Sequence, residues 1–151
     1  MSRVIILRHA KAEKLAETDH ARPLSKRGLE QVRACRQWLL DLPFQVDFAI
    51  VSSSVRTMQT WQGLELSNPV LITDEAYNAS AEQLVHLIRH SDHVHETVLL
   101  IAHNPGVSDL AFANGFHGEL ATCGAVVIEI DGTLSQFGLV DGAPAQVFTP
   151  M

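Results

Sequence analysis

The sequence lacks any apolar stretch of membrane-spanning length. A transmembrane helix needs about 20 apolar residues, whereas the apolar runs here, such as residues 4–7 and 98–102, are far shorter. The N-terminus, Met1-Ser2-Arg3 followed by a short apolar run, is too short for a signal peptide. We therefore expect no membrane partner.

Basic residues and cysteines are both scarce. The chain carries 11 Lys and Arg against 17 Asp and Glu, a net charge of −6, with no Lys/Arg-rich block. This balance argues against nucleic acid as a partner. It does not exclude an anionic substrate, because the field inside a pocket depends on local charges. The two cysteines, Cys35 and Cys123, are far apart in the sequence, which gives no disulfide framework and fits a cytoplasmic protein.

Apolar runs alternate with amphipathic segments along the 151 residues, which we expect to fold as a single domain, 1–151. Short aliphatic runs predict strands at 3–8, 46–51, 69–72 and 97–102. Helical spacing of apolar residues predicts helices that begin near Ser25, at 54, at Ser80 and, with Asn104 as N-cap and Pro105 at the first helical position, near 105. This alternation predicts an α/β fold, a three-layer α/β/α sandwich with a mostly parallel central sheet.

The C-terminal part has the pattern of an antiparallel hairpin. Residues 124–130 and 134–140 flank Asp131-Gly132, a pair typical of hairpin turns. We therefore expect the last two strands there, and a tail over 143–151.

Arginine and histidine follow the predicted strands at the points where those strands end. Arg8-His9 follows the run at 4–7, and His103 follows the run at 98–102. Arg56 lies in the opening turn of the helix that follows the strand 46–51. Open α/β sheets place their ligands at the carboxyl ends of the strands, so we expect these four residues to meet there. Arginine offers a planar fork of donors that suits phosphate.

The first strand is followed by a polar loop, residues 10–24, that is longer than the usual connection between a strand and a helix. We expect it to be an active-site loop. Gly28, in the first turn of the next helix, costs about 1 kcal/mol relative to alanine, so we expect a neighbour that requires a bare backbone at this position.

Four sequence blocks together resemble the histidine phosphatase superfamily, whose fold is like that of phosphoglycerate mutase. They are Leu7-Arg8-His9-Ala10, residues 22–28 (RPLSKRG), residues 52–60 (SSSVRTMQT) and residues 102–106 (AHNPG), in that family's order. The short chain and the stretch 77–80 (YNAS) are most similar to phosphohistidine phosphatases of the SixA type. The resemblance implies a hydrolase without a cofactor or metal that acts on phosphohistidine in a protein and binds phosphate or other oxyanions in its pocket.

The chemistry assigns a role to each of the four strand-end residues. His9 serves as nucleophile if one ring nitrogen is free while the other donates to a backbone carbonyl. Arg8 and Arg56 hold the phosphate oxygens through charge-assisted hydrogen bonds. His103, protonated or as a neutral donor, stabilises the developing charge.

Five further residues are candidates for binding the substrate or supporting the site. The hydroxyls of Ser52, Ser54 and Thr122 could donate to an oxygen, although hydroxyls near strand ends are also common helix caps. Arg22 and Asn104 lie in blocks that face the site in the family that this chain resembles, and Asn104 has the alternative of a helix cap.

Two groups of polar residues are expected to lie outside the chemistry. Asp74 and Glu75 are the possible general acids, but we expect them to be solvated loop carboxylates, because imidazole is a good leaving group once protonated and SixA-type enzymes lack a clear acid there. The histidines 86, 90, 93 and 95 form a patch with no complete ligand set, so we expect a solvated helix end and no metal.

Three functions remain open from the sequence. The first is a phosphohistidine phosphatase, the second a small-molecule phosphomonoesterase, and the third a non-catalytic phosphate-binding domain. The presence of all four strand-end residues argues against the third, because a degenerate pocket would usually have lost one.

Overall fold

The computed structural model of the chain describes residues 1–91 and 96–151. Within these residues, six strands form one mixed sheet in the order β3-β2-β4-β1-β5-β6. The strands are β1 Ser2–Arg8, β2 Phe48–Ser52, β3 Val70–Thr73, β4 Thr97–Ala102, β5 Ala125–Ile130 and β6 Ala143–Phe148. The helices are α1 Lys26–Leu40, α2 Val55–Leu64, α3 Ala81–Arg89 and α4 Gly106–Ala113, with short 3-10 turns η1 Asp74–Ala76 and η2 Leu134–Gln136. None of these helices is long and apolar enough to cross a membrane.

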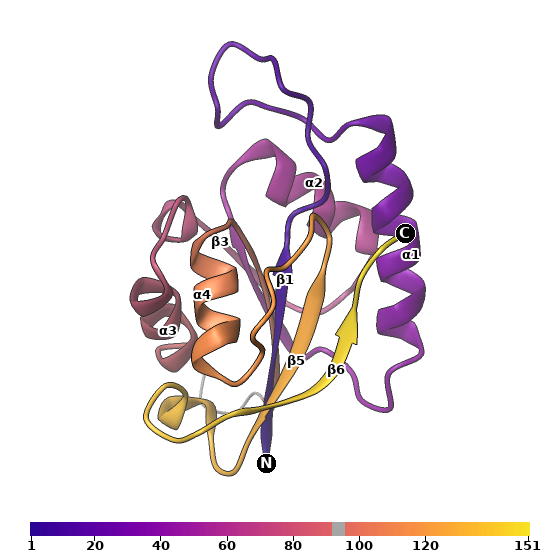
Figure 1. Cartoon of the computed structure of the whole chain (residues 1–151). Helices are drawn as coiled ribbons and strands as arrows, with labels where there is room; N and C mark the ends of the chain where they lie inside the picture. Colours follow the sequence, from indigo (N-terminus) through magenta and orange to yellow (C-terminus); the bar gives the residue numbers. More distant parts are fainter. Residues whose placement is uncertain (92–95) are drawn as a thin grey trace.

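The layers follow from the alternation of side chains along the strands. In β1, Val4 and Ile6 pack with α3 and α4, whereas Ile5 and Leu7 pack with α1 and α2. Since successive strand residues point to opposite faces, each central strand supplies both apolar cores. Figure 1 shows α3 and α4 on one side of the sheet and α1 on the other. The prediction of an α/β/α sandwich with a mostly parallel sheet is confirmed.

The position of the last strand was predicted wrongly. Residues 134–140 form no strand: Gln136 Oε1 accepts from the backbone N–H of Thr133 at 3.2 Å, and the chain folds into η2. Leu134 and Phe137 are fully buried and tie this segment to the core beside α3. The strand antiparallel to β5 is instead β6, within the predicted tail. It is an exposed edge strand that contains Pro144, which explains its weak apolar pattern.

The start of α4 lies one residue later than predicted. Pro105 occupies the N-cap position, and the Asn104-Pro105 peptide bond is cis. Asn104 therefore lies outside the helix, but its side-chain oxygen still accepts hydrogen bonds from the backbone N–H of Ser108 at 3.3 Å and from its hydroxyl at 2.6 Å. It satisfies a helix-terminal donor without being the N-cap residue.

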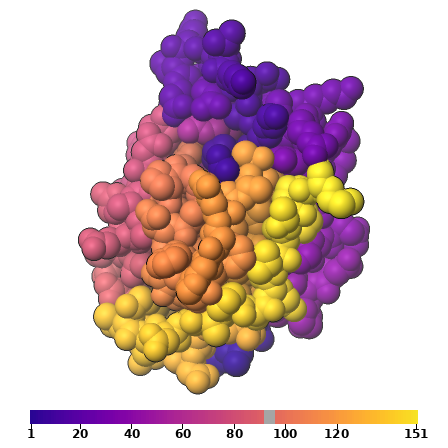
Figure 2. Space-filling model, in the orientation of Figure 1, coloured from indigo at the N-terminus to yellow at the C-terminus, as the bar shows by residue number. Residues whose placement is uncertain are grey.

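The sheet topology brings the strand ends together. β2, β4 and β1 are adjacent and parallel, so their carboxyl ends lie side by side at one edge. β5 runs in the opposite direction, and its first residue, Ala125, pairs with Leu7 near the end of β1. The segment that leads into β5 therefore reaches the same edge. The predicted polar loop after β1, called the 11–24 loop below, projects beyond the body at this end, in indigo and purple in Figure 2.

Candidate active site

A pocket of about 530 Å³ lies at the carboxyl edge of the sheet. Seven of its lining residues were candidates from the sequence, and four of the other five come from the 11–24 loop. The lining residues are Arg8, His9, Lys11, Ala12, Lys14, Asp19, Arg22, Arg56, Asn78, His103, Asn104 and Thr122. The structure thus places the four strand-end residues around one cavity.

His9 has one ring nitrogen fixed and the other free. Its Nδ1 lies 2.7 Å from the carbonyl oxygen of Ala10, which can only accept, so Nδ1 carries the hydrogen and Nε2 carries the lone pair. Burial lowers the pKa of His9 to about 4, with Arg56 and Arg8 acting in the same direction and the Ala10 hydrogen bond opposing them. The ring is therefore neutral at pH 7 and has the form that a nucleophile requires.

The backbone of His9 is held from three sides. Its N–H donates to the carbonyl of Ala102 at the end of β4 at 3.2 Å, and its own carbonyl accepts from the N–H of Cys123 at 2.9 Å. The next residue, Ala10, donates to Thr60 Oγ1 of α2 at 3.0 Å. Because strand β4, the segment that leads into β5 and helix α2 all donate or accept these hydrogen bonds, the backbone that carries the imidazole is held in one position.

His103 lies beside His9 with a defined tautomer as well. The two ring centroids are 5.3 Å apart. Its Nδ1 lies 3.3 Å from Arg56 Nη2, which can only donate, and its Nε2 therefore donates to Ser52 Oγ at 2.7 Å. Burial, followed by His9 and Arg56, lowers the pKa of His103 to about 3. Of the two protonation states expected from the sequence, the neutral one fits this geometry.

The two arginines of the strand-end group have donors left over. Arg56 is 4% exposed, and its Nε is buried without a hydrogen-bond partner among the described residues. Arg8 donates from Nη1 to the Leu120 carbonyl at 3.1 Å, and its Nε is likewise buried and unpaired in the described structure. Both side chains line the pocket, and a guanidinium group donates but does not accept, so the pocket suits an acceptor such as a phosphate oxygen.

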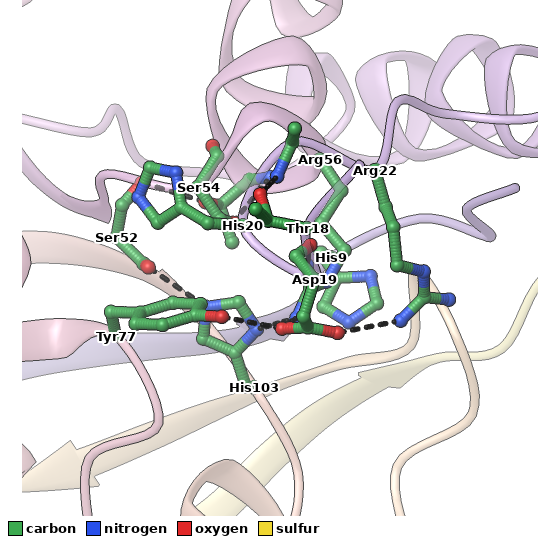
Figure 3. Close-up of polar contacts among 12 residues, drawn as sticks. His9, Thr18, Asp19, His20, Arg22, Ser52, Ser54, Arg56, Tyr77 and His103 are labelled. Atoms are coloured by element: carbon green, nitrogen blue, oxygen red, sulfur yellow. Dashed lines mark hydrogen bonds and ion pairs between the residues drawn. The ribbon is translucent and has the colours of Figure 1, made fainter. Parts of the chain in front are cut away.

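A carboxylate of the 11–24 loop joins the site, and sequence reasoning missed it. Asp19 accepts from Arg56 Nη2 at 3.0 Å, from Arg22 Nη1 at 3.0 Å and from the hydroxyl of Tyr77 (Figure 3). Its backbone carbonyl accepts from Arg56 Nη1 at 2.7 Å. No local signal separates Asp19 from Glu13 and Glu17 on the same loop, so only the folded chain distinguishes it.

The loop is attached to the start of α2 as well as to the arginines. The carbonyl of His20 accepts from the N–H of Val55 at 3.0 Å, and the His20 ring lies 3.0 Å from Ser53 Oγ. The prediction that Gly28 meets a close neighbour is confirmed: a Cβ there would lie 2.1 Å from the carbonyl oxygen of Lys11. The loop therefore begins against the bare backbone of α1.

The remaining candidates have mixed placements. Ser52 contacts His103 but does not line the pocket, and Ser54 is the N-cap of α2. Thr122 lines the pocket and accepts from Gln31 at 3.1 Å. Arg22 and Asn104 line it too, the latter donating to the Leu120 carbonyl at 3.1 Å.

Of the two groups expected to lie outside the chemistry, no member that the structure describes lines the pocket. Asp74 and Glu75 are exposed in η1 and are not among the lining residues. The rings of His86 and His90 have centroids 4.0 Å apart, and His90 Nδ1 donates to the His86 carbonyl at 2.8 Å. His93 and His95 lie outside the described residues. Among residues 1–91 and 96–151, no group of three or more His, Cys, Asp or Glu side chains could hold a metal ion.

A family model and a curated relative both match this chain. Residues 4–78 match the model of the histidine phosphatase superfamily, branch 1. The uncharacterised protein Rv1276c of Mycobacterium tuberculosis is 33% identical over 108 residues, which cover 70% of this chain and 67% of that protein.

Two solved structures share the fold over nearly the whole chain. A candidate phosphohistidine phosphatase SixA from Nakamurella multipartitia superposes with a TM-score of 0.92 at 22% identity and covers 99% of this chain and 96% of its own. The protein histidine phosphatase SixA complexed with tungstate gives a TM-score of 0.80 at 22% identity, with 98% and 97% covered. At these identities the likeness shows a common fold.

Proposed function

Because this chain belongs to the histidine phosphatase superfamily, we propose that it hydrolyses a phosphoryl group through a phosphohistidine intermediate on His9, and that its substrate is phosphohistidine in a protein. Family membership makes the chain a phosphatase. One observation carries the mechanism: the free Nε2 of a neutral His9 lies in a pocket lined by the guanidinium-bearing residues Arg8 and Arg56.

In the first step, the lone pair of His9 Nε2 forms a bond to phosphorus while the bond from phosphorus to the leaving group breaks. His9 Nδ1 keeps its hydrogen on the Ala10 carbonyl throughout, so the ring orientation does not change. The leaving group takes the bonding electron pair. In the second step, water attacks phosphorus, the P–Nε2 bond breaks, and phosphate carries away the proton of the water.

Arg8 and Arg56 hold the oxygens that carry the charge during both transfers. Both side chains line the pocket, and a charge-assisted hydrogen bond to an oxyanion is stronger than one between neutral groups. His103 is held by Ser52 on one nitrogen and faces Arg56 with the other, which fixes both side chains beside the phosphoryl site. Arg22, Asn104 and Thr122 line the same pocket and would contact substrate at its rim.

The choice of phosphohistidine rests on the leaving group. Hydrolysis of an alkyl phosphate requires a proton donor for the alcohol, and both carboxylates of η1 lie outside the pocket. A protonated imidazole leaves without such a donor. The fold shared with two SixA structures supports the same choice, and the tungstate bound in one of them supports an oxyanion site in this pocket.

Trapping tests the mechanism. The enzyme is mixed with labelled phosphohistidine protein, quenched and digested. We expect an acid-labile, base-stable label on the peptide that contains His9. An acid-stable label, or a label on another residue, would contradict the intermediate.

Two specificity constants test the substrate. We expect kcat/KM for a phosphohistidine protein to exceed that for an alkyl phosphate by at least about tenfold, which is about 1.4 kcal/mol in transition-state free energy. Asp74→Asn and Glu75→Gln should change the first constant little. A preference for the alkyl phosphate, or a large loss in either variant, would assign the protein to the small-molecule phosphomonoesterases.

The setting of the enzyme is part of the proposal. Both apolar cores pack on one sheet, which supports a single domain over residues 1–151. Cys35 and Cys123 are buried free thiols, which supports a reducing compartment such as the cytoplasm.

A further inference from the structure

Asp19 is the only carboxylate among the described residues that line the pocket. It lies on the 11–24 loop with its side chain half exposed, so it is at the mouth rather than the base of the cavity. The nucleophile His9, in contrast, is 8% exposed. In an in-line transfer the leaving group departs on the side opposite the nucleophile, which is the direction of the mouth.

Three donors keep the Asp19 carboxylate ionised. Arg56 and Arg22 each donate to one of its oxygens at 3.0 Å, and the Tyr77 hydroxyl donates to the same oxygen as Arg56. The hydrogen bonds of Tyr77 and Arg22 lower the pKa of Asp19 far below its usual range. A carboxylate in this state accepts hydrogen bonds but has no proton to give to an alkoxide.

We infer that Asp19 is a specificity-determining residue whose carboxylate accepts a hydrogen bond from the protonated ring nitrogen of the substrate phosphohistidine. The inference rests on the proposed function and extends it to the leaving group. Phosphohistidine can carry a hydrogen on the ring nitrogen that is not bonded to phosphorus, and the ring is then cationic. An anion at the mouth of the pocket stabilises that cation.

The transfer balances without an added proton. His9 Nε2 bonds to phosphorus, the substrate P–N bond breaks, and its electron pair stays on the substrate nitrogen. The substrate ring loses its positive charge and departs as neutral imidazole with its N–H still facing Asp19. His9 now carries the positive charge, next to the Ala10 carbonyl that holds its Nδ1–H.

An alcohol leaving group meets the opposite situation. Its oxygen becomes negative as the P–O bond breaks, and the nearest carboxylate is already ionised and repels it. The same residue therefore favours a cationic nitrogen leaving group and disfavours an alkoxide. Asp19 can therefore discriminate between the two leaving groups without any contact between the enzyme and other parts of the phosphorylated protein.

Asp19→Asn tests the inference because it removes the charge and keeps the shape. The substrates are a phosphohistidine peptide and p-nitrophenyl phosphate, whose leaving group needs no proton and carries no cation. We expect the ratio of the two kcat/KM values to fall at least about tenfold, the cost of losing a hydrogen bond between charged groups. Glu17→Gln, which removes a charge from the same loop at an exposed position, should leave the ratio unchanged.

Tyr77→Phe separates charge from positioning. It removes one hydrogen bond of Asp19 and keeps the carboxylate anionic between two arginines, so the ratio should change by about threefold or less. If Asp19→Asn lowers both constants in proportion, Asp19 only positions Arg56 and the inference is wrong. An alkyl phosphate is assayed as a third substrate, and the inference is also wrong if Asp19→Asn selectively lowers kcat/KM for it, because Asp19 would then be a general acid. Wild-type enzyme that does not cleave phosphohistidine would instead refute the proposed function.

Discussion

The strand-end group (Arg8, His9, Arg56 and His103) and the 11–24 loop contribute to the pocket in opposite ways. The imidazoles of the strand-end group are buried and neutral, and they are held by backbone and side chains of the sheet and α2. The loop supplies partly exposed charges, Asp19 and Arg22. In the proposed mechanism, burial fixes the groups that form and break bonds, and exposure leaves Asp19 and Arg22 at the mouth, where the leaving group departs. The two proposals therefore assign the chemistry and the choice of substrate to different regions of the pocket.

The sharpest test of this division removes the nucleophile. His9→Ala should lower kcat/KM for a phosphohistidine protein by at least about 10³-fold, because the other imidazole of the strand-end group, His103, has both ring nitrogens engaged by Arg56 and Ser52. His90→Ala, at an exposed histidine of the α3 terminus, is the matched control and should retain wild-type activity. Residual activity above a few per cent in His9→Ala would move the chemistry out of the strand-end group.

Two arginines compare the regions directly. Arg56→Ala removes a buried guanidinium group and should lower kcat/KM about 10²- to 10³-fold. Arg22→Ala removes a partly exposed guanidinium group and should lower kcat/KM about tenfold. Arg56→Lys keeps the charge without the fork and should rescue only part of the loss. Equal losses for the two alanine variants, or a larger loss for Arg22, would show that the loop holds the phosphoryl oxygens.

Acid should destabilise the strand-end group before it affects the loop. The pKa values of His9 and His103 are lowered to about 4 and about 3 from an unfolded value of 6.5, so the unfolded chain binds more protons between pH 6.5 and 4. Stability is therefore complete above pH 6.5 and falls as the pH drops, by an amount of the order of 3 kcal/mol for each ring by pH 4.5. The lowered pKa of Asp19 acts only below about pH 4.

Urea unfolding at pH 7.0, 5.5 and 4.5 measures this loss of unfolding free energy. His103→Gln removes one titrating ring and should flatten the dependence between pH 6.5 and 4.5. A stability that is constant over that interval in the wild type, with ring NMR shifts that titrate near pH 6.5, would mean that the two histidines are more hydrated than their burial implies.

Gly28→Ala tests how closely the loop is fitted to the body. Helix propensity alone predicts a gain of about 1 kcal/mol, but the new Cβ would lie 2.1 Å from the Lys11 carbonyl oxygen. We expect a net loss of about 1 to 3 kcal/mol in the free energy of unfolding, the usual cost of overpacking. Glu30→Ala, at an exposed position of the same helix, is the control and should change it little. If Gly28→Ala is more stable than the wild type, the backbone at Lys11 can move away from the new Cβ at little cost.

The sequence predicts the strand-end group well because its signal is local. An apolar run that stops at Arg8-His9 or at His103 marks both the strand and its end. The parallel arrangement of adjacent strands then brings these ends together at one edge of the sheet. Asp19 carries no such signal, since its role depends on Arg56 and Tyr77, which are distant in the sequence. Single-sequence patterns do not contain that pairing.

The antiparallel strand at the C-terminus was predicted, but at 134–140 instead of Ala143–Phe148, for a related reason. Asp131-Gly132 reads as a tight hairpin turn, and Gly132 does adopt a positive φ of 119°. The chain nevertheless continues through η2, which buries Leu134 and Phe137 in the apolar core. β6 is partly exposed at the sheet edge. Because neither of its faces is fully buried, its sequence lacks the alternation of apolar and polar residues that identifies a strand.

Because β5 runs antiparallel to β1, the molecule has an attachment point far from its pocket. Ile130 at its far end pairs with Ser2, so the connection 131–142 lies at the end of the sheet opposite the pocket. Asp141 in that connection is exposed. An affinity tag inserted after Asp141 would let the enzyme be immobilised on a support with its pocket facing outward, free to receive a phosphorylated partner as large as a protein.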